Sequence, residues 1–139
     1  MRAIVIGGLM VGGLLLAGER AAAHHSFSAE FDNTQPITLT GIVTKVEWTN
    51  PHVWFYINVK DEATGEVANW GGEMGPPHQL QRRGWRRTSL QVGQEVTVNG
   101  FRSRNGSTRL SARNVTLTST GGSPGETLDA AGSGGTANE

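Results

Sequence analysis

Apolar and polar residues alternate along most of the middle of the chain, which is the pattern of half-buried β-strands. The clearest alternation covers 52–60 (HVWFYINVK). Its faces carry Val53, Phe55, Ile57 and Val59 on one side, and Trp54, Tyr56 and Asn58 on the other. We predict strands over 37–48, 52–60, 66–74, 95–101 and 108–118.

The first predicted strand changes phase in its middle. Ile37 and Leu39 share one face, and after Gly41 we expect Ile42 to face the core while Val43 points outward. A glycine in mid-strand together with a phase change predicts a bulge or a sharp coil.

Local signals mark the connections between the strands. A turn is predicted at Asn50–Pro51 and a hairpin at Asn105–Gly106. Pro77 opens a short helix over 77–83. Gly84 is placed to be the left-handed residue that ends this helix, with Trp85 packing back on Leu80.

Three strands, one short helix and two strands predict a fold class. A long, coiled first strand favours a small five-stranded antiparallel OB-like barrel, with the helix between strands 3 and 4. An open antiparallel sandwich of the same strands is the alternative. The predicted core comprises Leu39, Ile42, Val46, Val53, Phe55, Ile57, Val59, Val96, Val98, Val115 and Leu117.

The two ends of the chain differ from its middle. Residues 1–23 have a basic Arg2, an apolar run over 3–17 and alanines at 21–23, which is the pattern of a cleaved signal peptide. The run is too short for a stable membrane span, so we expect a periplasmic or secreted protein. We expect a β domain with an N-terminal arm over 24–118, and a disordered Gly/Ser-rich tail over 119–139.

Composition limits the classes of partner. Lysines plus arginines and acidic residues each number 12, so the formal net charge is zero. This balance gives no general attraction to nucleic acid or to anionic lipid, and we predict no nucleic-acid partner and no stable membrane span after cleavage. The chain has no cysteine, so its core alone must stabilise it. No nucleophile motif or phosphate-binding glycine loop is present, and nothing argues positively for an enzyme.

Histidines form the leading candidate site. Cleavage after Ala23 gives His24 a free α-amine beside its imidazole, and cleavage after Ala22 places His25 third in the mature chain. Either arrangement suits copper or a similar divalent metal. His52, which follows the predicted turn, is the best further imidazole.

Exposed aromatic and amide groups form a second candidate. We predict a ligand surface that contains Trp48, Asn50, Trp54 and Trp85. The arginines around Trp85 are interpreted as a solvated face.

Three segments resemble one known family. They are HHSFSAEFD at 24–32, PITLTGIVTKVEWTNPHVWFYINVKD at 36–61 and LQRRGWRRTSLQVGQEVTVNGFRSRNGSTRLSARNVTL at 80–117. Together they resemble a family of small exported bacterial proteins of unknown function. The resemblance implies an exported small β domain and supplies no activity. The matching positions are His24, His25, Phe27, Trp48, Asn50, Pro51, His52, Gly84 and Trp85.

These patterns lead to three functional hypotheses. The first is an exported binding module of the cell envelope, with copper bound through His24, His25 and His52. The second is a structural module that binds an envelope protein or peptide without a metal. The third and weakest is an oxidative copper enzyme built on the same N-terminal site.

Overall fold

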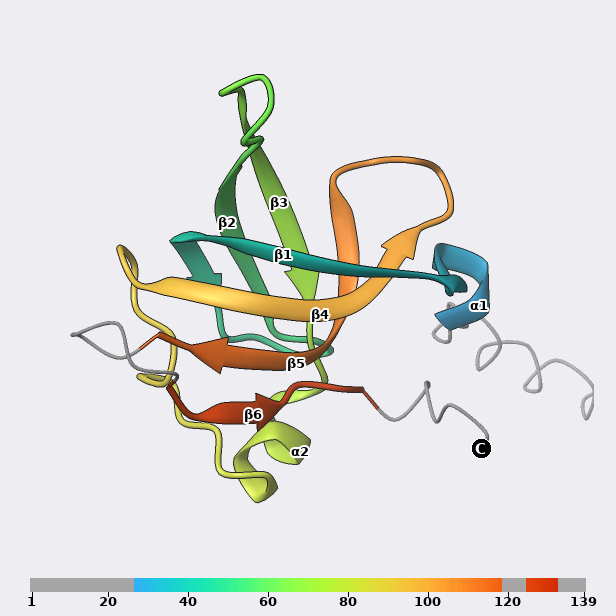
Figure 1. The fold of residues 1–139 in the computed structure, drawn as a ribbon. Coiled ribbons are helices and arrows are strands. Elements are labelled where there is room, and N and C mark those ends of the chain that lie inside the picture. Colours follow the sequence, from blue (N-terminus) through green and yellow to red (C-terminus); the bar gives the residue numbers. More distant parts are fainter. Residues whose placement is uncertain (1–26, 119–124, 133–139) are drawn as a thin grey trace, which may run out of the picture.

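The structure is a computed structural model that describes residues 27–118 and 125–132. The predicted leader and the histidines at 24 and 25 lie outside these residues. The elements are α1 (Phe27–Glu30), β1 (Phe31–Glu47), β2 (Trp54–Lys60), β3 (Val67–Glu73), α2 (Pro77–Arg82), β4 (Glu95–Ser103), β5 (Arg109–Leu117) and β6 (Thr127–Asp129) (Figure 1). No helix in the described ranges is long and apolar enough to cross a membrane.

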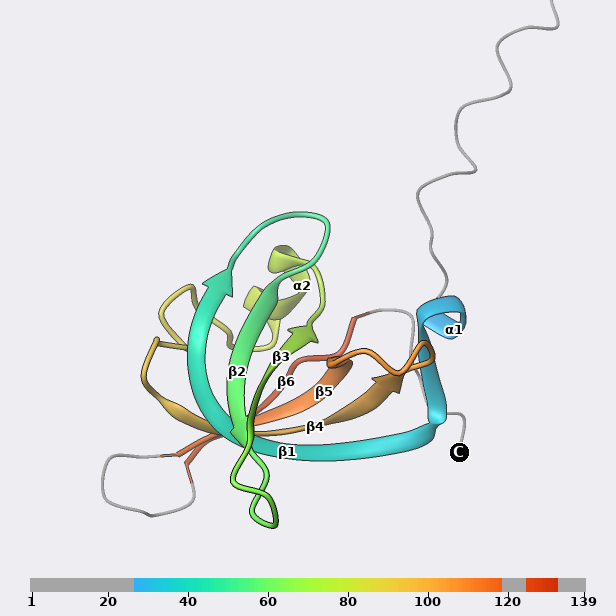
Figure 2. The same ribbon diagram turned by 90° about the horizontal axis from the view of Figure 1, so that it is seen from above.

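All six strands belong to one sheet, in the order β3-β2-β1-β4-β5-β6. Neighbours in this order are antiparallel, and β3 also pairs in parallel with β5, which closes β1 to β5 into a ring. β1 is long enough to pair with both β4 and β2, and it bends as it passes from one to the other (Figure 2). The all-β prediction is therefore confirmed, but the described residues form six strands rather than five, and β3 and β5 pair in parallel.

The phase predicted for β1 is wrong. Val43 is 1% exposed and Ile42 is 41% exposed, the reverse of the expectation. The register with β2 shifts between Val43 and Lys45, so the irregularity comes after Gly41 rather than at it. Gly41 is required for another reason, because a Cβ there would lie 2.5 Å from the carbonyl oxygen of Asn58.

The core lies inside the ring. Of the predicted core residues, Val53, Phe55, Ile57, Val96, Val98 and Val115 are fully buried. Leu39, Val46, Val59 and Leu117 are partly buried and pack against this cluster. The prediction omitted Val43, Trp70, Met74, Leu80, Trp85, Leu90 and Leu110, which are also buried. Several of these come from α2 and the connections, where no strand alternation marks them.

The end of α2 follows its prediction closely. Gly84 has a φ of +92°, the left-handed region that favours glycine. Its N–H donates to Gln81 O at 3.2 Å, and the Trp85 N–H donates to Leu80 O at 3.0 Å. These two bonds are the Schellman pattern, and they turn Trp85 back toward the core.

The predicted tail is wrong over 125–132. Thr127–Asp129 pairs with β5 as β6, with Leu128 only 7% exposed and Ala130 fully buried. The indole N–H of Trp85 donates to Asp129 O at 2.7 Å, so β6 lies beside the end of α2 (Figure 1). This segment is poor in apolar residues, but its backbone pairs with that of β5, and the burial of Leu128 stabilises the pairing further.

Candidate functional site

Trp54 and Tyr56 lie on the outer face of the ring. Their alternation with Val53, Phe55 and Ile57, which fill the core, leaves them no other face. Trp54 stands opposite Glu73 of β3 and Glu47 of β1. Tyr56 stands opposite Gly71 of β3 and Lys45 of β1. Strand register therefore gathers aromatic and charged side chains on one patch.

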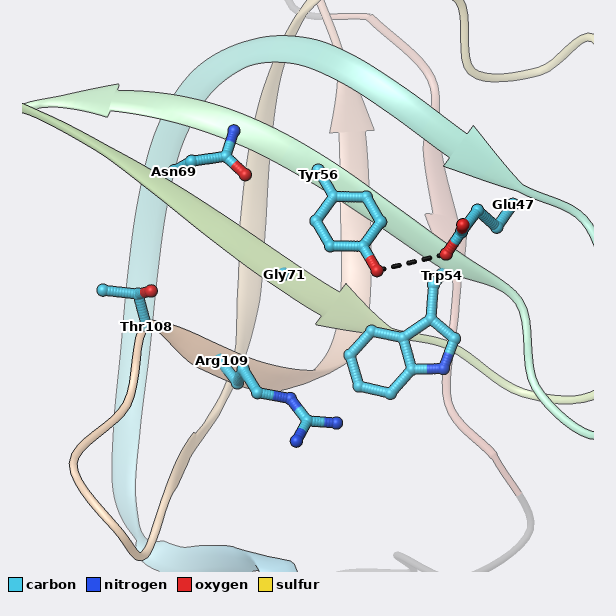
Figure 3. A pocket seen from close by; sticks show the side chains of 7 residues that line it. All are labelled: Glu47, Trp54, Tyr56, Asn69, Gly71, Thr108 and Arg109. Carbon is cyan, nitrogen blue, oxygen red and sulfur yellow. Dashed lines mark hydrogen bonds between the residues drawn. The ribbon is translucent and has the colours of Figure 1, made fainter.

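A hollow of about 400 Å³ opens on this patch. It is lined by Glu47, Trp54, Tyr56, Asn69, Gly71, Thr108 and Arg109 (Figure 3). A Cβ on Gly71 would lie 3.4 Å from Tyr56 Cε1 and 3.7 Å from Trp54 Cζ3. Because Gly71 has no side chain, the space between the two rings stays open, and larger residues at this position would fill it.

Glu47 is held on one side of the hollow. The Tyr56 hydroxyl donates to Glu47 Oε2 at 3.1 Å (Figure 3), and Lys45 Nζ lies 2.5 Å from Oε1. Lys45 and then Tyr56 lower the pKa of Glu47. Burial, followed by the bond to Glu47, raises the pKa of Tyr56. Glu47 is therefore an ionised carboxylate whose two oxygens are already bonded.

Arg109 lies across the hollow from this pair. Its guanidinium carbon is 4.7 Å from the centroid of the Trp54 ring, a cation–π contact. Arg109 begins β5 opposite Gly71, so the bare glycine lets the arginine side chain lie along the sheet. Within the described residues, its guanidinium has neither a hydrogen bond nor an ion pair.

His52 and Glu73 contact each other at the edge of the patch. His52 Nδ1 contacts Glu73 Oε1, and the two side chains are 42% and 13% exposed. Burial raises the pKa of Glu73, and this is the largest effect. The neighbouring His52 lowers this pKa, Glu30 raises it, and Arg109 lowers it more weakly. His52 follows the predicted turn, whose Asn50–Pro51 peptide is cis. Across 27–118 and 125–132, no three His, Cys, Asp or Glu side chains gather as a metal site.

The N-terminal arm docks on the same side of the ring. Phe31 is 4% exposed, and the Phe27 ring lies 5.7 Å from that of Phe31 and 6.0 Å from that of Phe101. Phe101 pairs with Ser111, which pairs with Glu73. The described chain therefore begins two strands away from Glu73, with both phenylalanines docked on the ring.

Other predicted site residues lie elsewhere. Trp85 is 2% exposed and belongs to the core, so the prediction that it forms part of a ligand surface is wrong. Trp48 packs partly against the core, and its buried indole nitrogen has no hydrogen-bond partner among the described residues. Asn50 is exposed in the turn. Only Trp54 of the predicted surface lines the hollow.

Sequence reasoning missed the residues that complete the patch, namely Glu47, Asn69, Gly71, Glu73, Thr108 and Arg109. They lie on β1, β3 and β5, which are distant in sequence, except Thr108, which directly precedes β5. The one available signal was the outward face of 52–60, which marks the strand at the centre of the patch but not its neighbours.

Known proteins add limited information. A solved structure of the mitochondrial single-stranded DNA binding protein Rim1 from S. cerevisiae is similar at 11% identity, with a TM-score of 0.48. The similarity covers 63% of this chain and 96% of that chain. Similarity at this level does not identify a ligand. No curated protein matches the chain.

One family model matches most of the chain. It spans residues 13–111, from before the described arm to the beginning of β5. The match includes His52, Glu73, Trp54 and Arg109, so it covers both the His52–Glu73 contact and the hollow. The chain therefore belongs to the family of unknown function DUF6152.

Proposed function

We propose that this protein is an exported binding module of the cell envelope that binds copper, or a similar divalent metal, through His52, His24 and His25. The supporting observation is the contact of His52 Nδ1 with Glu73 on an exposed edge of the patch. Metal-ligating histidines usually donate their second ring N–H to such a carboxylate, which fixes the tautomer and the ring orientation. In this arrangement Nε2 of His52 would be the nitrogen that binds the metal.

The length of the arm supports a shared site. Adjacent strands lie about 4.8 Å apart, so Phe101 is about 10 Å from Glu73 across β5. Phe27 docks on Phe101. An extended chain advances at most about 3.3–3.6 Å per residue, which allows His25 about 7 Å and His24 about 11 Å from Phe27. His24 can therefore span this distance from Phe27, whereas His25 needs the added length of its side chain to approach Glu73 and His52.

The chemistry of the donors suits copper. Imidazoles and an α-amine are ligands that Cu(II) prefers. The imidazoles must be neutral to bind, so copper affinity should fall as the solution is made acidic. Burial at Glu73 and docking of the arm fix part of this site in advance, which reduces the entropy lost when the ligands converge.

We also propose that the ring is an OB-like barrel. The order of pairing around it, β1–β2–β3–β5–β4, and the placement of α2 between β3 and β4 support this architecture. In this architecture the metal site would lie on the outer wall.

Copper titration of the processed protein tests the proposed function. Native mass spectrometry of the exported product gives its first residue and any bound metal. His52→Ala should weaken Cu(II) binding at least about tenfold, and Glu73→Gln should weaken it about 10–100-fold. His78→Ala is the matched control, because His78 is exposed on α2 and should not affect affinity.

Two results would overturn this proposal. A product that keeps Met1 has no free amine beside the histidines. Parent-like copper affinity for both His52→Ala and a variant with one extra N-terminal residue would reduce the site to an unstructured chelate. The structural module that binds an envelope protein would then be the better proposal.

A further inference from the structure

We propose that the hollow between β2, β3 and β5 is a second binding site, which takes a sugar unit that carries a carboxylate. The sugar ring would lie above Gly71 against Tyr56, and its carboxylate would meet the guanidinium of Arg109. This site is separate from the His52 metal site and does not depend on it.

The unbonded N–H donors of Arg109 indicate that the ligand of the hollow carries an anionic group. Stacking on Trp54 uses the face of the guanidinium and leaves its N–H donors at the edge of the plane. No acceptor in the described part of the chain bonds them. Planar carboxylates accept two parallel N–H bonds from such an edge, which makes Arg109 a prepared partner for one.

Charge elsewhere in the hollow is already balanced. Lys45 and the Tyr56 hydroxyl bond both oxygens of Glu47. Glu73 is turned to His52 rather than to Arg109. Arg109 is therefore the charge in the hollow that has no close partner among the described residues, and a carboxylate group of a ligand complements it.

The rest of the lining indicates a ring with hydroxyl groups. Asn69 Nδ2 donates to Thr44 and Asn58, while its Oδ1 accepts no bond from the described residues. The Thr108 hydroxyl is likewise not bonded within these residues and lines the rim. Sugar hydroxyls would satisfy both groups, whereas an aromatic acid of similar size would leave them unpaired. Aromatic side chains such as Tyr56 supply an apolar face for the sugar ring.

A nucleic acid fits this face less well. Single strands bind to grooves in which several basic residues follow the backbone. Here the lining of the hollow holds one arginine without a described partner together with the carboxylate of Glu47, and the whole chain has no net charge. The observations therefore favour an acidic sugar, and an oligonucleotide serves as a test of the alternative.

Calorimetric titration of the full processed chain with tri-galacturonate tests this proposal. Maltotriose is the neutral counterpart, benzoate is the aromatic acid, and a ten-nucleotide oligothymidylate is the single strand. We expect tri-galacturonate to bind at least about tenfold more tightly than each of the other three. Maltotriose lacks the carboxylate that makes the charge-assisted contact, and benzoate lacks the hydroxyl groups.

Variants place the binding in the hollow. Arg109→Gln should weaken tri-galacturonate binding at least about tenfold. Gly71→Val, a residue that strands tolerate, should abolish it by filling the space between Tyr56 and Trp54. Arg87→Gln is the matched control, because Arg87 is exposed in the connection after α2, and it should bind like the parent. Circular dichroism identifies any variant that has lost its fold.

The outcomes are distinct. Equal binding of tri-galacturonate and maltotriose, or unchanged affinity in folded Arg109→Gln, would overturn the proposal. Tighter binding of the oligonucleotide would replace it with a nucleic-acid site. If folded Gly71→Val bound like the parent, the sugar would not occupy the hollow. His52→Ala should leave tri-galacturonate binding unchanged, which separates this test from that of the metal site.

Discussion

Gly72 and Phe55 face each other across β3 and β2 inside the ring. Phe55 is fully buried, and a Cβ on Gly72 would lie 2.3 Å from Phe55 Cζ and 2.4 Å from Cε1. No side chain fits at position 72 while the Phe55 ring keeps its place. Gly72→Ala therefore forces this ring against the rest of the core.

The two positions should be strongly coupled in stability. Overpacking by Gly72→Ala should cost about 1–3 kcal/mol, and the cavity left by Phe55→Ala should cost about 3–5 kcal/mol. In the double variant the added methyl group enters the space that the ring has vacated. We expect the double variant to be about 1–3 kcal/mol more stable than the sum of the single effects implies.

Urea unfolding followed by circular dichroism measures this coupling. The pair Gly71→Ala and Tyr56→Ala is the matched control on the outer face, where a Cβ makes contacts no closer than 3.4 Å. If Phe55→Ala leaves too little stability to measure, Phe55→Leu gives the same cycle with a smaller cavity. Additivity within about 0.5 kcal/mol at Gly72 and Phe55 would refute the reasoning.

Three further predictions concern single residues. Trp85→Phe removes the indole N–H that bonds Asp129 O, and it should lower the unfolding free energy by about 1–3 kcal/mol in urea; a loss below about 0.5 kcal/mol would contradict the role of that bond. Gly84→Ala should cost about 1–2 kcal/mol, because its φ of +92° strains residues that have a Cβ; an unchanged melting temperature would argue against this strain. Burial raises the pKa of Glu73 above its ordinary 4.5. The folded protein then holds the carboxyl proton of Glu73 more tightly than the unfolded chain does. Protonated Glu73 therefore contributes stability below pH 4.5, and this contribution is lost as the pH rises through the raised pKa. The stability of Glu73→Gln relative to the parent should therefore increase from pH 4.5 to neutrality, and a flat difference would count against the raised pKa.

Local patterns in the sequence predicted local structure well. The alternation over 52–60 assigned Val53, Phe55 and Ile57 to the core, and all three are fully buried. The helix end was predicted as a left-handed Gly84 with Trp85 packing back on Leu80, because the chemistry of such an end is contained in a few neighbouring positions. Such features need no knowledge of which strands pair.

Features that depend on pairing were not predictable in this way. The shift at Val43 depends on the register with β2, so the sequence of β1 alone placed the irregularity at Gly41. Arg109 reaches the hollow only because β3 and β5 pair in parallel. Leu128 is a lone apolar residue in a polar segment, and its burial depends on an available edge of β5.

The two pairings along one edge of β5 have a consequence for self-association. Arg109–Ser111 pairs with β3, and Asn114–Thr116 pairs with β6, so consecutive stretches of the same edge have different partners. Ring closure alone would leave the second stretch with free N–H and C=O groups, which invite a strand from another copy. β6 pairs with these backbone groups, and we therefore expect it to prevent aggregation through this edge of β5. A chain that ends at residue 124 should form concentration-dependent oligomers in sedimentation velocity, whereas the full chain should not.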